Sequence, residues 1–524
     1  MKSPSVLLVL ASLLATLYAL GCSGESAGPK DPEDAGPMAT RDGGHRQLTD
    51  SPEPPTSPDG GASQETSLAP DAPAEDGGAS DPDPPPEDRW FTSGDGCVEP
   101  TDYVTAACEV VDCVETTTCM GDGHCVPSAP FGGAGGASGE SQLKPALALG
   151  GDGGFAVAWH AFTDGSPQVT RVYFQRFLPN GTPAGDATRV DDDHFPVSRS
   201  PSITRTEAGG FFVVWREESA LGEVRTMGQI IGADGVPGPG PLQLNSTPLE
   251  LSLVPGNVDS PFASLLRTGD LAVTWSADPA DPEAQSDVYL RVLGSDGTLQ
   301  GDELPTGGAT TANETSSVVT DTWDGGVAIF WHEQGNGILE GVVRGRLFNQ
   351  QGGPKGEVFT ASPQVDSYEG LPSATTFPEG EILLSWRVQQ GTSSADPMDV
   401  RTRLLDAQGL AIEDTAQTVW TSSSGYAPFY APIELSGSSR AVFAWHTSDE
   451  AVDSVFVRRY LHPEGLLDCS ITDAAGPLGV GELGGRHLPA LLGFPDGRIL
   501  VAWSSLFEVD GQPSSYRVVF RYLK

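Results

Sequence analysis

The stretch FAVAW (residues 155–159) has seven versions along the chain. The other six are FFVVW (211–215), LAVTW (271–275), VAIFW (327–331), ILLSW (382–386), AVFAW (441–445) and ILVAW (499–503). Successive tryptophans are 55 to 60 residues apart. Side chains alternate between the two faces of a β-strand, so Phe155, Val157 and Trp159 share one face while Ala156 and Ala158 share the other. Because a large face fits against a small one, the pattern predicts sheets stacked on sheets.

Each tryptophan stretch is the centre of a longer repeat. A proline or serine lies thirteen or fourteen residues before each tryptophan and predicts the start of a first strand. These residues are Pro145, Pro201, Pro261, Ser317, Pro372, Pro432 and Pro489. Asp-Gly turns such as Gly151–Gly154 join that strand to the tryptophan strand. An alternating third strand follows, then a glycine turn and a weaker fourth strand. Most third strands carry an arginine: Arg176, Arg291, Arg346, Arg403, Arg459 and Arg521, with Gln229 in the second repeat. We expect the repeated tryptophans and arginines to be structural, with each arginine bound to a turn carboxylate or a carbonyl.

Four antiparallel strands per repeat and seven repeats, without helical periodicity, predict an all-β fold, a seven-bladed β-propeller over residues 142–524. Immunoglobulin-like arrays need about 100 residues per domain and do not fit this period. The repeats resemble those of seven-bladed propeller families in general. They match none of the signatures that define WD, sialidase or integrin-type repeats, so the resemblance implies a fold and no activity.

The chain begins with Met1-Lys2 and an apolar run from Val6 to Leu20, which predicts a secretory signal. That run closes with Ala19-Leu20-Gly21-Cys22, which resembles the bacterial lipobox. The resemblance implies a signal peptide at 1–21, a lipid on Cys22, and a location on the bacterial cell envelope, at the outer membrane or cell surface. An ordinary secretory signal with an incidental cysteine is the alternative.

Residues 22–96 are mostly Pro, Gly, Ser, Ala, Asp and Glu, which predicts a disordered acidic tether. A cysteine-rich segment and a glycine-rich joint follow over 97–141. Its five cysteines and one distant cysteine permit three disulfides in an oxidising compartment: Cys97, Cys108, Cys113, Cys119, Cys125 and Cys469. Zinc is disfavoured because the spacing contains no CxxC pair. Repeat phase also predicts that Gly121–Ser128 supplies the strand missing from the last blade, with Cys469 bridged to one of the five N-terminal cysteines.

The composition limits the partners. With a formal net charge of −42, the chain does not suit nucleic acid, which is bound through Lys and Arg. The partners we expect are a membrane, reached through the lipid anchor, and a protein or glycan ligand.

The candidate ligand site is one rim of the predicted ring. The residue after the tryptophan is basic in five repeats: His160, Arg216, His332, Arg387 and His446. The connections from second to third strands vary most on that side, and a rigid scaffold can present diverse loops there. The histidines fall in separated repeats, so we expect no metal among them. No cofactor is expected either, apart from a weak candidate for a structural divalent cation at Asp191–Asp193.

The sequence contains no GxSxG, HExxH or P-loop motif. It therefore favours a binding or interaction module for protein or glycan over an enzyme. A propeller hydrolase or lyase acting on extracellular polymer and a structural component of an envelope assembly remain as alternatives, because catalytic residues on scattered loops leave no sequence motif.

Overall fold

The structure is a computed structural model of the whole chain. It describes residues 117–119, 125–127 and 132–523, the last range with gaps at 136–139, 164–168, 222, 247–248, 251–259, 280–284, 308–311, 335–340, 364–367, 391–395, 422–431, 436, 438, 448–453, 464, 468–470, 476–481 and 509–513. The chain divides into two units, residues 1–92 and 93–524, and every described residue belongs to the second. All elements in these ranges are strands. Within them no helix is long and apolar enough to cross a membrane.

The described strands follow the predicted repeat, and we number the repeats one to seven by their tryptophans. The first strands are β4 (Glu140–Leu149), β8 (Val197–Arg205), β13 (Phe262–Leu265), β17 (Asn313–Asp321), β21 (Tyr368–Thr376), β25 (Ile433–Leu435) and β30 (Glu482–Gly493). The second strands carry the tryptophans: β5 (Phe155–Thr163), β9 (Phe211–Glu218), β14 (Leu271–Pro279), β18 (Val327–Gln334), β22 (Ile382–Gln389), β26 (Arg440–Thr447) and β31 (Ile499–Phe507). The third strands are β6 (Thr170–Phe177), β10 (Glu223–Ile231), β15 (Asp287–Leu293), β19 (Gly341–Phe348), β23 (Met398–Leu405), β27 (Ser454–Leu461) and β32 (Ser515–Leu523).

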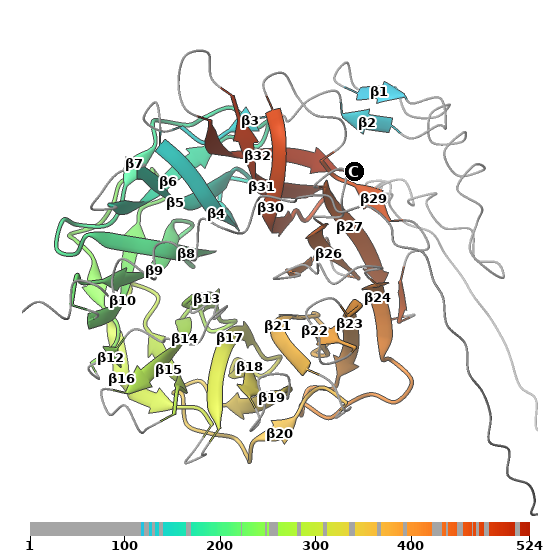
Figure 1. The fold of residues 1–524 in the computed structure, drawn as a ribbon. Coiled ribbons are helices and arrows are strands. Elements are labelled where there is room, and N and C mark those ends of the chain that lie inside the picture. Colours follow the sequence, from blue (N-terminus) through green and yellow to red (C-terminus); the bar gives the residue numbers. More distant parts are fainter. Residues whose placement is uncertain are drawn as a thin grey trace, which may run out of the picture. The chain divides into compact units, whose positions relative to one another are not determined.

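Outer strands are mostly short. They are β7 (Thr188–Arg189), β11 (Leu242–Gln243), β16 (Leu299–Pro305), β20 (Phe359–Thr360), β24 (Gln417–Thr421), β28 (Leu466–Leu467) and β29 (Thr472–Asp473). One further pair of residues, β12 (Leu249–Glu250), bonds to both β10 and β14 and so joins two neighbouring repeats in one sheet. Figure 1 shows the repeats following one another around a central opening, with the first strands innermost. Because all described elements are strands, the predicted all-β class is confirmed. No sheet closes on itself within the described residues, and the blade count stays a prediction.

The tryptophans are buried between repeats, as the large-face and small-face pattern predicts. Trp215 of repeat two packs in one cluster with Ala156, Ala158 and Val172 of repeat one. The same arrangement recurs at the other junctions, and Trp159 of repeat one packs against Leu500 and Ala502 of repeat seven. All seven tryptophans are at most 2 % exposed. Because removing such a side chain typically costs about 3–5 kcal/mol, these junctions account for much of the stability.

In repeats one, two, five and seven the proline lies inside the first strand, which corrects the prediction that the strand begins there. In repeats three and six, Pro261 and Pro432 directly precede β13 and β25, as predicted. In β4 the pairing register shifts between Leu143 and Ala146, on either side of Lys144 and Pro145. Equivalent shifts occur in β8, β17, β21 and β30. The residue at the shift has a left-handed backbone in five repeats: Lys144, Ser200, Ser316, Leu371 and Leu488. A bulge is one of the few interior positions where a sheet accepts proline, since the ladder is already interrupted there.

The first strand of each repeat has a full hydrogen-bonding partner on one side only, and the other edge faces the centre. Hydroxyl side chains satisfy part of this edge from the neighbouring repeat. Ala263 N–H donates to Ser202 Oγ (3.3 Å) and Leu265 N–H donates to Thr204 Oγ1 (3.2 Å). Ile433 N–H donates to Ser373 Oγ (3.1 Å). The serines and threonines near the centre therefore join one repeat to the next.

Four of the repeated arginines bind a turn carboxylate or a backbone carbonyl, as predicted for a structural role, and three of them bridge repeats. Arg176 binds the turn carboxylate of Asp152 at 2.6 Å. Arg291, Arg346 and Arg521 donate instead to backbone carbonyls of the preceding repeat, those of Leu244, Thr306, Ala474 and Ala475.

The last repeat borrows a strand from the N-terminal side, but not from the predicted residues. β3 (Gly132–Gly133) pairs antiparallel with β32, and Ala134 N–H donates to the Val518 carbonyl. β1 (Thr117–Cys119) and β2 (Cys125–Pro127), which include part of the predicted segment 121–128, pair with each other. A Cβ atom on Gly133 would come within 3.3 Å of the Val518 oxygen, so a larger residue there would require a small shift of β32. Cys119 lies opposite Cys125 in the β1–β2 hairpin, while Cys22, Cys97, Cys108, Cys113 and Cys469 lie outside the described residues, so the disulfides stay predictions.

We predict that Ser373→Ala lowers the free energy of unfolding by about 1–3 kcal/mol, because it leaves the buried Ile433 N–H without an acceptor. Urea unfolding followed by tryptophan fluorescence measures this change. Ser295→Ala, at an exposed position in the β15–β16 turn, is the matched control and should cost less than about 0.5 kcal/mol. Equal losses in both variants would show that the hydroxyl bridge does not stabilise the junction.

Candidate functional site

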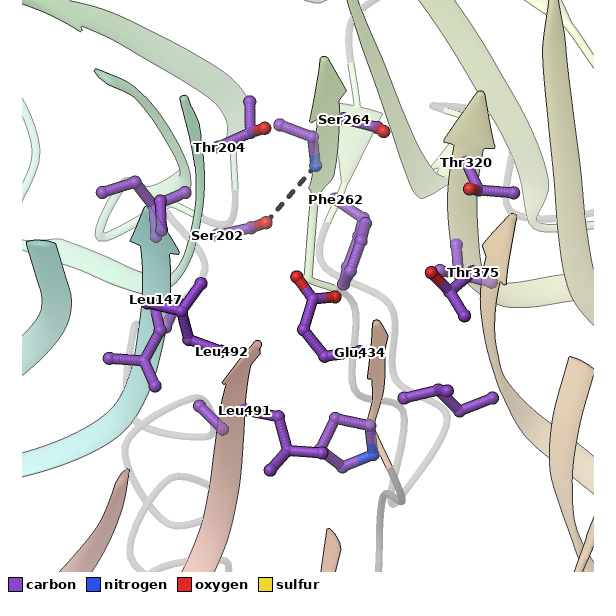
Figure 2. A pocket seen from close by; sticks show the side chains of 18 of the residues that line it. Leu147, Ser202, Thr204, Phe262, Ser264, Thr320, Thr375, Glu434, Leu491 and Leu492 are labelled. Atoms are coloured by element: carbon purple, nitrogen blue, oxygen red, sulfur yellow. Dashed lines mark hydrogen bonds between the residues drawn. The ribbon is translucent and has the colours of Figure 1, made fainter. Parts of the chain in front are cut away.

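The central cavity is the candidate site. Its volume is about 900 Å³, and first-strand residues of all seven repeats line it. Cavities of a few hundred to about 1,000 Å³ suit small ligands or segments of a polymer. Many of the side chains in the wall are hydroxyl or apolar, and Figure 2 shows the hydroxyl side chains of Ser202, Thr204, Ser264, Thr320 and Thr375.

One carboxyl group stands out in this wall. Glu434 of β25 points into the cavity in Figure 2. The residues in register with it on the other first strands carry no charge: Ala148, Thr204, Ser264, Thr320, Thr375 and Leu492. No hydrogen bond or ion pair to the Glu434 carboxylate is found among the described residues. Burial alone raises its pKa to about 7. Both the acid and the carboxylate are therefore populated at neutral pH, as a group that exchanges protons requires.

The other carboxylate among the described lining residues is held in place. Asp321 of β17 accepts from Arg267 Nε at 2.7 Å. Arg267 also donates to the Phe377 carbonyl, so this pair links the first strands of repeats three and four to repeat five. Burial raises the pKa of Asp321, while the Arg267 guanidinium opposes that shift. We assign this pair to the architecture of the cavity end.

The five basic residues predicted to form a ligand rim are mostly buried at repeat junctions, and none lines the cavity. His160 accepts from the Ser200 backbone N–H (3.4 Å) in the next repeat. His332 Nδ1 lies 3.3 Å from Thr315 Oγ1. Its ring also packs on Tyr368, and Arg387 lies over the same tyrosine.

The remaining two members of that rim have similar surroundings. Arg216 pairs with Glu218 at 3.0 Å, and the His446 ring lies 6.3 Å from that of His487 in the next repeat. Only His332 and Arg387 are thus brought together. Burial lowers the pKa of His160 and His332 to about 3 and that of His446 to about 4, so all three are neutral at physiological pH. Their role in ligand binding stays a prediction, because the variable connections beside them lie outside the described residues.

The acidic run Asp191–Asp193, a weak cation candidate from the sequence, is paired with side chains of opposite charge. Arg189 binds Asp191 at 3.0 Å and Asp193 at 2.7 Å. Arg171 lies 3.7 Å and 3.4 Å from the same two carboxylates. The two guanidinium groups take the place that a cation would have there.

Two further buried carboxyl groups belong to the repeat junctions. Glu217 accepts from Trp215 Nε1 at 3.0 Å, and Glu369 accepts from the Ser362 hydroxyl. Burial raises the pKa of each to about 7 against the effect of these hydrogen bonds. Neither lines the cavity. Asp321 also combines a raised pKa with a position in the wall, but it is paired with Arg267, so among the described lining residues Glu434 is the carboxyl group with a raised pKa and no partner.

Sequence reasoning did not single out Glu434. The signal was present, since an acidic residue interrupts a register of small, hydroxyl or apolar residues near the proline of repeat six. Pro432 precedes Trp445 by thirteen residues, whereas the spacing is fourteen in the other repeats. When the repeats are aligned on this position, Glu434 is therefore one residue out of register and its difference from the other repeats is hidden.

No protein-family model and no curated protein matches the chain. Among solved structures, an α-L-arabinanase from Penicillium chrysogenum is 14 % identical over 75 % of this chain and 97 % of its own, with a TM-score of 0.43. The polysaccharide lyase Uly1 is 11 % identical over 74 % and 92 %, with a TM-score of 0.45. An α-L-arabinofuranosidase from Fusarium graminearum is 13 % identical over 63 % and 95 %, with a TM-score of 0.41.

These findings contradict the expectation that a non-enzymatic role is favoured. The three structures are those of glycoside hydrolases and a polysaccharide lyase, and we withdraw that expectation. At 11–14 % identity and TM-scores below 0.5 they assign no activity to this chain.

We predict that Glu434→Gln becomes more stable relative to the natural protein as pH rises from about 5 to about 8. A folded pKa of about 7, above the unfolded value of about 4.5, means that the folded state holds the extra proton between these values. The natural protein therefore loses this stability as pH rises through that window, whereas the uncharged glutamine does not. Urea unfolding at intervals of one pH unit measures the difference, and parallel curves would contradict the raised pKa.

Proposed function

We propose that the chain is a carbohydrate-active enzyme that cleaves glycosidic bonds of an extracellular polymer in the central cavity of a seven-bladed propeller. The observation that carries this proposal is Glu434, a carboxyl group in the cavity wall with a pKa near neutrality and no partner among the described residues. Phe262, another residue of the cavity wall, offers an apolar aromatic surface for a sugar ring. The seven tryptophan clusters, one of which joins repeats one and seven, support the ring.

In this proposal Glu434 transfers the proton. Its acid form donates to the glycosidic oxygen as the bond to the anomeric carbon breaks. Water then adds to that carbon, and the proton it releases returns to the Glu434 carboxylate. One water is consumed, with its hydroxyl on one product and its second hydrogen on the other.

We favour hydrolysis over elimination because of charge. Elimination by a lyase removes a proton next to the carboxylate of a uronic acid, so its substrates are polyanions. A protein with a formal net charge of −42 repels polyanions at low and moderate salt. A neutral polysaccharide therefore fits this chain better.

The envelope location belongs to the same proposal. Cys22, acylated after cleavage of the signal, would hold the enzyme at the cell envelope, at the outer membrane or cell surface, and the acidic tether over 22–96 would separate it from the bilayer. Polymer that cannot enter the cell would be accessible to an enzyme displayed in this way.

We predict that Glu434→Gln lowers kcat on a neutral polysaccharide by about 10²–10⁴-fold, the usual contribution of a positioned proton donor. Release of reducing ends from a panel of neutral and uronic acid-containing polysaccharides identifies the substrate. Glu413→Gln, at an exposed position, is the control and should keep full activity. Unchanged kcat in Glu434→Gln would remove Glu434 from the mechanism, and unsaturated products that absorb in the ultraviolet would indicate elimination instead.

We predict that Cys22→Ser moves the protein from the membrane fraction to the soluble fraction of its native host, since no acyl chain can then be attached. Fractionation followed by immunoblotting measures this. A Ser23→Ala variant keeps the cysteine and should remain with the membranes. Membrane association that survives Cys22→Ser would contradict the anchor.

A further inference from the structure

A histidine and two glutamates meet at the junction of repeats five and six, away from the cavity. Glu379 and Glu381 belong to the tight turn between β21 and β22, where Phe377 N–H donates to the Glu381 carbonyl (2.8 Å) and Gly380 N–H donates to the Phe377 carbonyl (3.0 Å). His462 directly follows β27 of repeat six. One ligand atom of each of the three side chains lies within 4.8 Å of the other two.

The imidazole is fixed and points at both carboxylates. His462 is 4 % exposed, and its ring stacks on Phe377 with centroids 4.1 Å apart. Its Nε2 lies 3.7 Å from Glu381 Oε2, and its Nδ1 lies 3.8 Å from Glu379 Oε2. These separations are too long for hydrogen bonds. Among the described residues neither ring nitrogen has another hydrogen-bonding partner.

The oxygen that faces His462 Nε2 is also unsatisfied. Glu381 Oε2 is buried and forms no hydrogen bond in the described part of the chain. A buried acceptor without a donor is costly, and the imidazole nitrogen 3.7 Å away can bind a cation through its lone pair, so a cation between the two atoms would satisfy both. Two ligands of a tetrahedral zinc ion stand about 3.4 Å apart at the usual bond lengths, close to the 3.7 Å observed here.

We propose that this cluster binds one divalent transition-metal ion of the zinc type. His462 Nε2 and Glu381 Oε2 are the two inner ligands. Glu379, whose side chain is 58 % exposed and has room to rotate, is the third, and water completes the shell. Nitrogen with two carboxylate oxygens is a ligand set that zinc accepts and that calcium, which prefers oxygen alone, does not. The ion would tie the β21–β22 turn of repeat five to the end of β27 in repeat six.

The test is zinc binding to the full chain, stripped of metal and titrated with ZnCl₂ in a calorimeter. We expect one saturable site that Glu381→Gln and Glu379→Gln each weaken by at least about 10-fold. Glu207→Gln, an exposed carboxylate in the corresponding turn of repeat two, is the matched control and should bind as the natural protein does. The glutamate variants are preferred to His462→Ala because the histidine packs in the core.

Cobalt distinguishes this site from one made of cysteines. Bound Co²⁺ should show no thiolate-to-metal charge-transfer band, and the Glu379→Gln/Glu381→Gln double variant should lose the Co²⁺ signal. The proposal is overturned if zinc does not bind, if Ca²⁺ binds in its place, or if zinc binding survives in the double variant.

Discussion

Burial of one tryptophan per repeat against the small side chains of the preceding repeat is the contact on which the rest of the structure depends. A β-sheet with a large face and a small face cannot cover both alone. Each repeat therefore needs a neighbour on both sides, and the pairing of Trp159 with repeat seven extends this need to the ends of the array. The bridging arginines and the borrowed strand β3 reinforce junctions that the tryptophans create.

That stacking leaves the cavity-facing edge of each first strand without a full partner strand. Backbone N–H and C=O groups at this edge need other partners, and this determines which side chains line the cavity. Hydroxyl groups of one repeat accept from backbone N–H groups of the next, so most polar groups there are used for structure. A polar side chain in the cavity wall that makes no such bond to a neighbouring repeat is unusual. Glu434 is one, and burial without a partner raises its pKa to about 7. The same constraint that builds the ring thus isolates one carboxyl group in its cavity.

The rim and the turns illustrate how similar residue types take different roles. His160, His332 and His446 lie at repeat junctions, where burial keeps them neutral, and their role in ligand binding stays a prediction. His462 is also buried, yet both of its ring nitrogens face carboxylate oxygens instead of backbone or hydroxyl groups. The groups that face the ring nitrogens of a buried histidine therefore decide whether it can bind a metal.

The sequence by itself determined the all-β class, the seven repeated strand patterns, the burial of the tryptophans and the structural use of the arginines. These follow from local alternation and from the spacing of residues, which are visible in a linear chain. The position of the prolines at bulges, the use of Gly132–Gly133 in place of 121–128, and the raised pKa of Glu434 depended on tertiary structure. So did the meeting of Glu379, Glu381 and His462. Each of these depends on how strands from different repeats face one another, and on how far water is excluded between them, which no local pattern records.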